Sequence, residues 1–374
     1  MRASVLVVGA GPTGLVLANL LGRAGVSTLL VERNAETVSE PRAVSIDDES
    51  LRTLQTIGLA DAMRQHLLWS TGYNYIAPSG RCFARIEPTT TEYGYPRRSN
   101  FHQPTLERIL RQGLERFREV SVSFGHELES LRQDEDGVSA RLVTPGGDAV
   151  EARADWLVAC DGARSTVRTL VGIGMVGSTY EQQWLIVDTA NDTDGYRHSR
   201  FFCNPRRPTV SVPGPGRTRR WEFMLRPGES AEEMLEPQAV RALLRPHRGD
   251  ALAEIVRTAV YTFHARVAER WSERRIFVAG DAAHLTPPFA GQGMNIGIRD
   301  ATNLAWKLAA VSRGAIGPRL LESYERERRD HAWRMILLAV RIGWVMMPTS
   351  AWRARLMTAV LGALSAVPSV RDWV

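Results

Sequence analysis

The first 32 residues contain the feature that most restricts the fold of this chain, a strand, a glycine-rich turn, a helix and a second strand in close succession. Residues 4–8 form an apolar run of the kind found in parallel strands covered on both faces. The turn GAGPTG at residues 9–14 follows, and a leucine-rich helical pattern continues to a stop at Gly25. Residues 27–31 are the second strand. Two strands joined by a helix in so short a span predict a Rossmann-type α/β sheet.

The glycine-rich turn also predicts a ligand. Its spacing, GxGxxG, is a weak signal alone, but here it lies between a strand and a helix, and Glu32 follows the next strand. Glycines allow a pyrophosphate to approach the backbone and rest on the helix N-terminus, while Glu32 can accept two hydrogen bonds from a ribose. We therefore predict a dinucleotide, and the motif leaves open whether it is NAD or FAD. The turn residues predicted to contact it are Gly9, Gly11, Pro12, Thr13 and Gly14.

A second informative stretch reads RRIFVAGDAAHLTPPFAGQGMNIGIRDATNLAWKL and covers residues 275–308. A short β-prone run ends at Gly280-Asp281, the pair Pro287-Pro288 stiffens the next turn, and glycines at 291, 293 and 297 open a segment with helical spacing. Glycine lets the backbone lie against a flat ligand, and a helix start offers unpaired N–H groups with a partial charge of about +0.5. This predicts a site for an electron-rich, partly anionic ring. A strand–turn–helix with glycines for packing alone would leave the combination of GD, PP and GxGMN unexplained.

Composition restricts the class of protein. With 374 residues we expect two domains, and 44% hydrophobic and 24% charged residues are typical of a soluble globular protein. The net charge is +6, but the arginines are scattered or paired and no basic helix carries interleaved aromatics, so we expect no nucleic-acid binding. No stretch reaches the roughly 20 apolar residues of a membrane span, and no signal peptide is recognisable. The three cysteines form no CxxC, so we expect no metal, no disulfide and a reducing, cytoplasmic location.

The chain changes character along its length. Residues 175–270 alternate short β-prone pieces with Pro/Gly turns, which favours a mostly antiparallel sheet, and residues 73–100 are rich in Tyr, Pro and Arg. We predict an α/β protein with a Rossmann-type nucleotide-binding domain, an inserted substrate domain and a C-terminal helical segment. The expected boundaries are 1–72, 101–174 and 271–315 for the nucleotide domain, 73–100 and 175–270 for the substrate domain, and 316–374 for the helices.

Three motifs of the kind found in nucleotide-binding proteins follow one another along the chain. They are GxGxxG with Glu32, the string DGARS at 161–165 with Arg168, and Gly280-Asp281 with residues 291–295. In this order the chain resembles the single-component FAD-dependent aromatic hydroxylases, the group that contains para-hydroxybenzoate hydroxylase. It is most similar to the 3-(3-hydroxyphenyl)propionate hydroxylase branch. The likeness extends from residue 2 to about residue 340. The strings that carry the closer likeness are PRAVSIDDESLRT, PRRSNFHQPTLE, EFMLRPGE and GDAAHLTPPFAGQGMNIGIRDATNLAWKLA.

The resemblance implies FAD as cofactor and NADH or NADPH as a transient co-substrate. It places the AMP half on the GxGxxG turn and Glu32, the flavin chain near Gln103, the ribitol on Asp281, and the flavin N1–C2=O edge on the amides of residues 291–295. The DGARS string would serve both FAD and the nicotinamide. The full expected set is Gly9, Gly11, Pro12, Thr13, Gly14, Glu32, Arg33, Arg42, Gln103, Asp161, Asp281, Pro288, Gly291, Gly293, Met294 and Asn295.

The implied activity is hydroxylation of a small phenolic aromatic substrate. In this chemistry NAD(P)H reduces FAD, O₂ adds at the flavin C4a, and the hydroperoxide delivers oxygen to an electron-rich ring. The cofactor carries the difficult step, so no side-chain catalyst is assigned. Pro287 and His284 are weak candidates because they would lie near the flavin, and His284 is better explained as a residue that stabilises the turn.

Other readings stay open. A flavin-dependent halogenase shares this fold, but the WxWxIP string of halogenases does not occur. An oxidase or a non-catalytic flavin-binding protein would keep the phosphate and ribose residues, although it would not need the Pro-Pro and GQGMN strings. A plain NAD dehydrogenase leaves the stretch around Asp281 unexplained. Longer members of the resembling branch continue into a thioredoxin-like domain, and we expect the apolar helical tail of this chain to be a contact surface, such as a homodimer interface.

Overall fold

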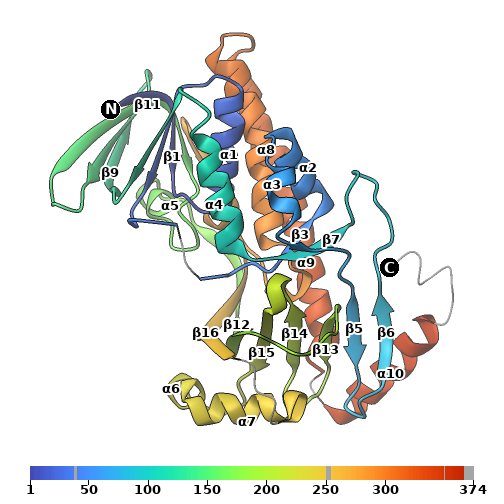
Figure 1. Cartoon of the computed structure of the whole chain (residues 1–374). Helices are drawn as coiled ribbons and strands as arrows, with labels where there is room; N and C mark the ends of the chain where they lie inside the picture. The colour runs from blue at the N-terminus through green and yellow to red at the C-terminus, as the bar shows by residue number, and fades with distance from the viewer. Residues whose placement is uncertain (38–39, 250–253, 349, 366–374) are drawn as a thin grey trace. The chain divides into compact units, whose positions relative to one another are not determined.

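The computed structural model describes residues 1–37, 40–249, 254–348 and 350–365. The chain divides into two compact units (Figure 1). The first unit comprises Met1–Gln65, Gln103–Ser178 and Ala265–Leu337, and the second comprises His66–His102, Thr179–His264 and Leu338–Val374. Residues 366–374 of the predicted C-terminal helices lie outside the described residues.

The first unit is built on a sheet with the strand order β17-β18-β11-β1-β2-β8. The pairings β18–β11, β11–β1, β1–β2 and β2–β8 are all parallel, while β17 and the β9–β10 hairpin add antiparallel pairs. The central strand β1 has no exposed surface from Val5 to Val7, as expected for a parallel strand with both faces covered. The strand bounds are β1 Arg2–Val8, β2 Thr28–Glu32, β3 Ser45–Asp47, β8 Val120–Phe124, β9 Glu127–Gln133, β10 Val138–Val143, β11 Ala149–Ala159, β17 Ser272–Glu273, β18 Ile276–Val278 and β19 His284–Leu285.

Helices cover this sheet, and α1 packs against both α4 and α8 (Figure 1). Pro12 occupies the first turn of α1, where its missing N–H costs no hydrogen bond. The helix bounds are α1 Pro12–Arg23, α2 Asp48–Thr56, α3 Ala60–Arg64, α4 Gln103–Leu114, α5 Thr166–Leu170, α8 Gly293–Ser312 and α9 Ser323–Met346, with 3₁₀ turns η2 Gly280–Ala282, η3 Pro288–Ala290 and η4 Pro318–Glu322. The Rossmann-type prediction is confirmed, since a strand, the GAGPTG turn and a helix open a parallel sheet.

The second unit contains a sheet in which β12, β15, β14, β13, β5 and β6 follow one another. Four of these neighbouring pairs are antiparallel and the β13–β5 pair is parallel, in agreement with the expected mostly antiparallel sheet. The bounds are β4 Leu67–Leu68, β5 Tyr73–Ile76, β6 Cys82–Ile86, β7 Arg98–Phe101, β12 Met175–Ala190, β13 Ser199–Phe202, β14 Thr209–Pro213, η1 Pro215–Arg217, β15 Arg219–Met224, α6 Ala231–Leu235, α7 Pro237–Arg248, β16 Glu254–Ala268 and α10 Ala351–Ser365.

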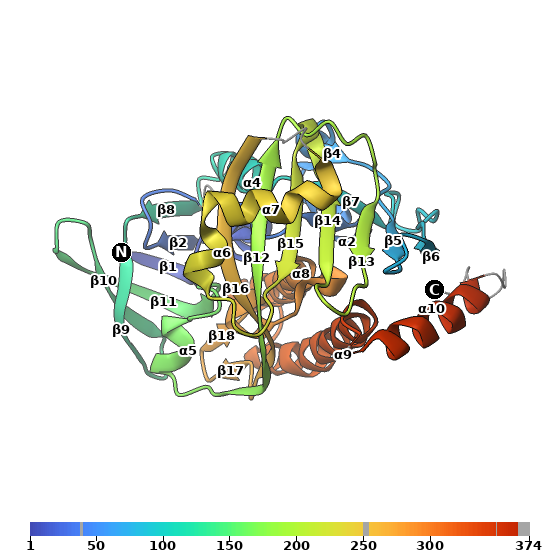
Figure 2. The ribbon, with the colours of Figure 1, turned by 90° about the horizontal axis from the view of Figure 1, so that it is seen from below.

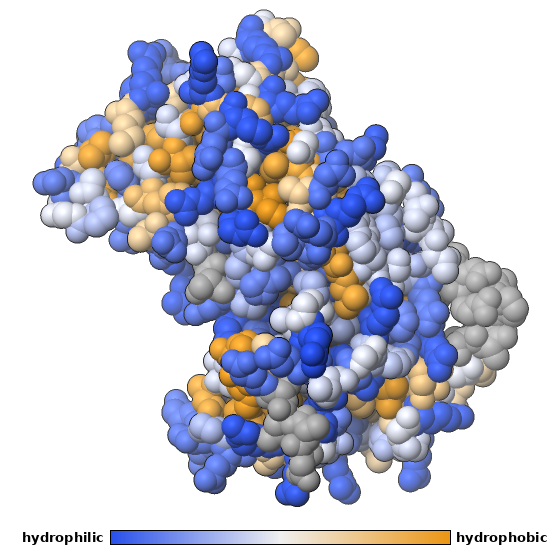
Figure 3. Space-filling view, viewed as in Figure 1, coloured by the Kyte–Doolittle hydropathy of each residue, from blue (hydrophilic) through white to orange (hydrophobic). Residues whose placement is uncertain are grey.

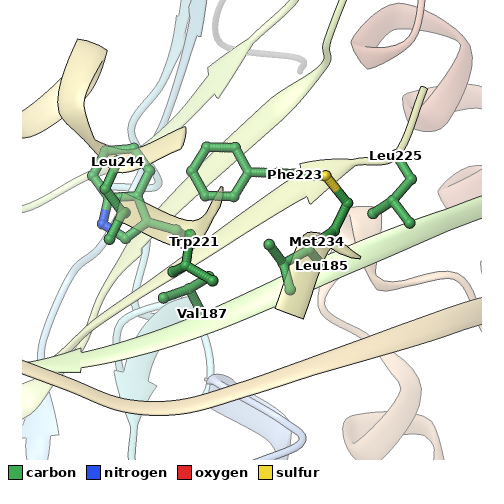
Figure 4. Close-up of a cluster of buried hydrophobic side chains, with 8 residues drawn as sticks. Leu185, Val187, Trp221, Phe223, Leu225, Met234 and Leu244 are labelled. Atoms are coloured by element: carbon green, nitrogen blue, oxygen red, sulfur yellow. The ribbon is translucent and has the colours of Figure 1, made fainter. Parts of the chain in front are cut away.

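Helix α7 lies across one face of this sheet and covers its apolar residues (Figure 2). Trp221 and Phe223 of β15 project to this face together with Leu185 and Val187 of β12 (Figure 4). Met234 of α6 and Leu244 of α7 complete the cluster from the helical side. Because side chains alternate along a strand, the neighbours Arg220 and Glu222 point to the opposite face. The sheet therefore has one face closed by helices and a second face that carries buried charged residues.

The surface carries apolar residues in groups separated by hydrophilic ones, as the face in Figure 3 shows. This mixture is ordinary for a protein surface. Among the described residues no single helix is long and apolar enough to cross a membrane, and only Pro318–Met346 and Ala351–Ala363, taken together across a bend of 112°, satisfy such a test by length and composition.

Candidate functional site

Two of the three sequence signals of the first unit meet around one side chain, Thr13. A Cβ atom added to Gly280 would lie 2.5 Å from Thr13 Oγ1, and one added to Gly297 would lie 2.4 Å from the same atom. These distances are too short for any side chain, so both positions require glycine. The start of α1 thus fits against the Gly280 turn and the first turns of α8, which brings the GxGxxG motif and the Gly-Asp motif together.

In the GxGxxG turn the backbone is tightly packed at Gly9 and Gly14 and open at Gly11. Gly9 has φ +105°, and a Cβ there would lie 2.4 Å from the carbonyl oxygen of Cys160. A Cβ on Gly14 would lie 2.0 Å from the Gly9 carbonyl oxygen, so both glycines are needed for the tight turn. A Cβ on Gly11, by contrast, would meet no atom within 4 Å. The backbone at Gly11 therefore faces open space beside the N-terminus of α1, as a bound pyrophosphate requires.

Glu32 connects the end of β2 to this turn. Its Oε2 accepts a hydrogen bond from the Ala10 N–H at 2.8 Å, and its Oε1 accepts from the backbone and side-chain nitrogens of Asn34 at 2.9 and 2.7 Å. The carboxylate is thereby held in place while it remains partly accessible. A carboxylate has about four lone-pair sites, so acceptor capacity remains for ribose hydroxyls. Arg33, also predicted to bind cofactor, is exposed, and the structure assigns it no partner in this cluster.

The DGARS string is bonded to the Gly280 turn. Ser165 caps α5 by accepting from the Arg168 N–H at 2.9 Å, and the Arg168 guanidinium donates to the carbonyl oxygen of Ala282 at 3.0 Å. Asp161 accepts from the Val167 N–H at 3.1 Å through Oδ2, but its buried Oδ1 has no hydrogen-bond partner among the described residues. A buried oxygen without a partner is costly and indicates a missing donor.

Asp281, the predicted ribitol carboxylate, stands out on the Gly280–Ala282 turn because its side chain is exposed and receives no hydrogen bond from the described residues. The protein groups around Asp281 displace water from it and raise its pKa overall, although the nearby His284 and Arg42 act in the opposite direction. The side chain nevertheless reaches solvent, so its carboxyl oxygens are accessible to a ligand. The predicted residues Asp281 and Arg42 are therefore brought near each other, and Asp281 is free to accept from a ligand hydroxyl.

Beneath this turn lies a buried ionic cluster that holds it in place. Asp300 of α8 accepts from the Gly280 N–H at 3.1 Å, from His284 Nε2 at 2.7 Å and from Arg328 Nε at 3.0 Å. His284 and Asp300 have no exposed surface, and the His284 ring stacks on Trp271 with ring centroids 5.6 Å apart. Burial would raise the pKa of Asp300, but His284 and Arg328 outweigh it and lower that pKa. This geometry favours a positioning role for His284 over a catalytic one.

Asp300 and Arg328 were not recognised from the sequence, although one signal was available. Asp300 follows Ile296 and precedes Leu304 by four residues each, so helical spacing places its carboxylate on the apolar, buried face of α8. A charged residue on such a face requires buried partners. Its partners His284 and Arg328 could not be identified from sequence spacing alone.

The start of α8 is fixed by Asn295. Its side-chain nitrogen donates to the Gly291 carbonyl at 2.9 Å, and its Oδ1 accepts from Ser50 Oγ at 2.8 Å and from the Asp47 N–H at 3.2 Å. The side chain is only 1% exposed, so any cofactor contact of Asn295 would use its backbone N–H. The helix has no side-chain cap, which leaves its first N–H groups available to an acceptor.

Gly291 and the proline pair define the turn in front of this helix. Gly291 is in the left-handed region at φ +62°, and its Cβ would lie 2.3 Å from Ser45 Oγ, so a larger residue is excluded. Pro287 is buried, while Pro288, Gly293 and Met294 are half-buried and accessible to a ligand. Among the described residues this turn contributes no acid or base of its own, so its contribution is shape and backbone N–H groups.

Gln103 at the start of α4 performs a local structural task. Its Oε1 accepts from the backbone N–H groups of Arg42 and Ala43 at 3.0 and 2.6 Å, and its Nε2 donates to Glu107 at 2.7 Å. The side chain thus fixes the segment that carries Arg42, whose own side chain is exposed. Any contact between Gln103 and a cofactor would use the remaining hydrogen of its amide.

Taken as donors and acceptors, this cluster fits a dinucleotide with a flat ring. It offers an open backbone at Gly11, carboxylates at Glu32 and Asp281, an unsatisfied oxygen on Asp161 and an uncapped helix at residues 293–295. No group of three or more His, Cys, Asp or Glu residues in the described part of the chain could hold a metal ion. The arrangement can therefore bind and orient a cofactor, while the chemistry has to come from that cofactor.

Comparison with known proteins shows the family to which the chain is related. The profile of the FAD binding domain family matches residues 2–339. A 3-(3-hydroxy-phenyl)propionate/3-hydroxycinnamic acid hydroxylase of Comamonas testosteroni is 45% identical over 372 residues, which are 99% of this chain and 63% of the relative. The enzyme of the same name from Klebsiella pneumoniae is 44% identical over 99% of this chain and 67% of its own length. The chain thus spans about two thirds, or slightly less, of these curated relatives.

Solved structures show the same fold. The p-nitrophenol 4-monooxygenase of Pseudomonas putida DLL-E4 has a TM-score of 0.92 at 26% identity, with 100% of this chain and 96% of that chain covered. Aklavinone-11 hydroxylase, solved as a ternary complex with FAD and aklavinone, has a TM-score of 0.84 at 30% identity, with 96% and 70% covered.

Proposed function

Because this chain belongs to the FAD binding domain family, we propose that it is a flavin-dependent monooxygenase that uses NAD(P)H and O₂ to hydroxylate a phenolic ring. The observation that carries the proposal is the Gly280–Ala282 turn, which presents the accessible Asp281 carboxylate and is held from beneath by Asp300. The similarity to aromatic hydroxylases over 99% of the chain supports the same activity.

FAD is the cofactor, and we propose how the first unit holds it. The pyrophosphate would lie at Gly11 and the start of α1, the adenosine ribose at Glu32, and the ribitol hydroxyls at Asp281. The Oδ1 of Asp161 would accept a hydrogen bond from the cofactor, since it has no donor among the described residues. The N–H groups at residues 293–295 would stabilise negative charge on the ring edge of a reduced flavin. Gln103, Asn295 and His284 would act by fixing the backbone around these contacts.

When bound, FAD supplies the activation of O₂ and the transfer of one oxygen atom to the ring. The residues of this chain would orient the two rings and exclude water from them. The transferred oxygen is a mild electrophile, so the substrate ring has to be electron-rich, and a phenol meets this condition. The relatives named above act on hydroxyphenylpropionate and hydroxycinnamate, and we propose a related small phenol for this chain.

We further propose that the first unit is the FAD-binding domain and that the second unit supplies the substrate-binding sheet. A cytoplasmic location is proposed because Cys82, Cys160 and Cys203 are all free thiols. A homodimer is proposed because large apolar side chains on α9 and α10 are exposed, including Trp344 at 69% and Trp352 at 62%. Light scattering on the purified chain would test the last point, and a monomer mass at micromolar concentration would contradict it.

The experiment that tests the activity measures three quantities together in one reaction. Purified FAD-loaded protein is mixed with NADH or NADPH, air-saturated buffer and a panel of phenols, and NAD(P)H, O₂ and hydroxylated product are followed. The proposal predicts equal amounts of all three with at least one phenol, and faster NAD(P)H oxidation when that phenol is present. Consumption of NAD(P)H with peroxide as the sole oxygen product across the panel would indicate an oxidase. Chlorination of a phenol in the presence of chloride would indicate a halogenase. The absence of any NAD(P)H oxidation would indicate a non-catalytic binding protein.

A further inference from the structure

Arg98, at the start of β7 in the second unit, is a buried arginine whose charge is not balanced. Its side chain is only 9% exposed. One guanidinium nitrogen lies 3.5 Å from the Gly72 carbonyl oxygen and 3.3 Å from Ser199 Oγ, which are long and neutral contacts. The buried Nε has no hydrogen-bond partner among the described residues. The guanidinium therefore has donors to spare in a place where water does not satisfy them.

No carboxylate within the described residues forms an ion pair with Arg98. Burial lowers the pKa of Arg98, and within the described residues the groups that act against this effect are the phenols of Tyr73 and Tyr75. Burial also raises the pKa of Tyr75, so that phenol stays neutral and supplies no negative charge. An arginine nevertheless remains protonated at neutral pH. Burying a cation without an anion is strongly unfavourable, so a counter-ion is expected from outside the chain.

Other buried arginines of the same unit show the contrast. Arg220 is paired with Asp188 at 2.7 and 3.0 Å. Arg219 lies 3.4 Å from Asp192 and also donates to two carbonyl oxygens. Both have a carboxylate within ion-pair distance. Arg98 is also buried, but it lacks a carboxylate partner in the part of the chain that the structure describes.

The surroundings of Arg98 indicate what kind of anion fits. The guanidinium carbon lies 3.9 Å from the centroid of the Tyr73 ring, in a cation–π arrangement. The Tyr73 and Tyr75 rings stack on Phe201 with centroids 5.4 and 5.1 Å apart. In the β13–β5 register Tyr73 is opposite Ser199 and Tyr75 is opposite Phe201, so all four side chains lie on one face of the sheet. Helix α7 covers the other face. An aromatic wall of this kind accepts a planar apolar ligand and disfavours a strongly hydrated polyanion such as a phosphate.

We infer that Arg98 is the residue that binds the carboxylate of an aromatic acid substrate, with the aromatic part of that substrate against the Tyr73–Phe201 wall. A guanidinium suits this task because its planar fork can bind a carboxylate through two parallel hydrogen bonds. The inference rests on the proposed hydroxylase function and narrows its substrate class from phenols in general to phenols that carry a carboxylate on a side chain. Arg98 would thus determine specificity without taking part in the oxygen transfer.

The test compares the affinity of the protein for an aromatic acid with its affinity for the corresponding uncharged amide. The probes are 3-(3-hydroxyphenyl)propionate and 3-(3-hydroxyphenyl)propanamide, which have nearly the same shape and differ in charge. Dissociation constants are measured on FAD-loaded protein from the change in flavin absorbance, without NAD(P)H, so that no turnover is needed. The variants are Arg98→Met and Arg98→Lys, and the matched control is Arg85→Met, which removes an exposed positive charge from β6 of the same sheet.

The wild type should bind the acid at least about 10-fold tighter than the amide, in line with a charged hydrogen-bonded pair. Arg98→Met should abolish this preference, Arg98→Lys should keep part of it, and Arg85→Met should keep all of it. Ligand-free Arg98→Met should also melt no lower than the wild type, because an unbalanced buried charge is removed. A structural arginine would instead give a lower melting temperature and an equal loss of affinity for both probes.

Several results would overturn the inference. It fails if the wild type does not distinguish acid from amide, or if Arg98→Met keeps the wild-type preference. If Arg98→Met does not fold, Arg98→Lys decides, since a full wild-type preference in that variant excludes bidentate recognition. Failure of the proposed function looks different, because the acid would then bind through Arg98 but no phenol would be hydroxylated. Hydroxylation of phenols without preference for a carboxylate would refute the role of Arg98 alone.

Discussion

Two aspartates on either side of one turn should respond in opposite ways to the same substitution. Asp300 lies beneath the Gly280–Ala282 turn with no exposed surface and accepts three hydrogen bonds, one of them from Arg328. Asp281 lies on the turn with an exposed side chain and no hydrogen bond from the described residues. The structure therefore assigns stability to Asp300 and cofactor binding to Asp281.

The magnitudes follow from these contacts. Asp300→Ala leaves the buried charge of Arg328 without its carboxylate, and breaking a buried pair from one side costs about 3–5 kcal/mol. Such a loss lowers the melting temperature by roughly 6 °C or more. Asp281→Ala removes no hydrogen bond between described residues, so the free energy of unfolding of the FAD-free protein should change by less than about 0.5 kcal/mol. Loss of a charged hydrogen bond to the ribitol would weaken FAD binding by about 1.5–3 kcal/mol, or roughly 10- to 150-fold.

The assay is thermal unfolding of FAD-free protein combined with fluorescence titration of FAD. Asp300→Ala should unfold at a lower temperature, and FAD should rescue it only in part because the turn itself is displaced. Asp281→Ala should unfold like the wild type and bind FAD weakly. The reasoning is refuted if Asp281→Ala destabilises the FAD-free protein as much as Asp300→Ala does, or if it leaves the FAD affinity unchanged.

Three further predictions concern packing, cofactor choice and pH. Gly297→Ala should destabilise the first unit because the new Cβ would lie 2.4 Å from Thr13 Oγ1. Adding Thr13→Ala should restore part of the lost melting temperature. An unchanged melting temperature in the double variant, relative to Gly297→Ala, would contradict this contact. Glu32→Arg should reduce the FAD content of the purified protein while leaving the NADH to NADPH rate ratio nearly unchanged, and a clean switch to NADPH would show that the GxGxxG motif binds the nicotinamide instead. Burial, with a smaller contribution from Asp188 and against the effect of Arg220, raises the pKa of Glu222 from 4.5 to about 7. A carboxyl group whose pKa is raised in the folded state contributes fully to stability at a pH below its unfolded-state pKa. This contribution, about 3 kcal/mol here, is lost as the pH rises through the folded-state pKa. Glu222→Gln should therefore gain melting temperature relative to the wild type between pH 5 and pH 8, and a pH-independent difference would exclude this titration.

The turns and their glycines could be predicted from the sequence because their causes are local. Gly14 is required by its contact with the Gly9 carbonyl oxygen, and Gly9 and Gly291 by turns in which φ is positive. The helical spacing that follows these glycines likewise predicted a helix there, and the structure has α8 at this place. Such features depend on neighbours in the chain, which a sequence pattern records.

The partners that hold the site could not be predicted, because they are distant in the chain. Gln103 binds the peptide of Arg42 across 61 residues, and Asn295 bonds Ser50 across 245. Nothing in spacing alone identifies such pairs. The length of β12 was not predicted either, because only short β-prone pieces were expected between residues 175 and 270. The strand runs for 16 residues, and its first half is mostly exposed and lacks the apolar alternation that marks a strand.

The most direct measurement is the fate of ¹⁸O₂ during turnover of FAD-loaded protein with NAD(P)H and a phenol such as 3-(3-hydroxyphenyl)propionate. A hydroxylase inserts one oxygen atom of O₂ into the ring and reduces the other to water. The account therefore predicts one ¹⁸O atom in the new hydroxyl group of the product, in an amount equal to the NAD(P)H consumed. Recovery of the label only as peroxide or water, with every phenol of the panel left unchanged, would contradict it.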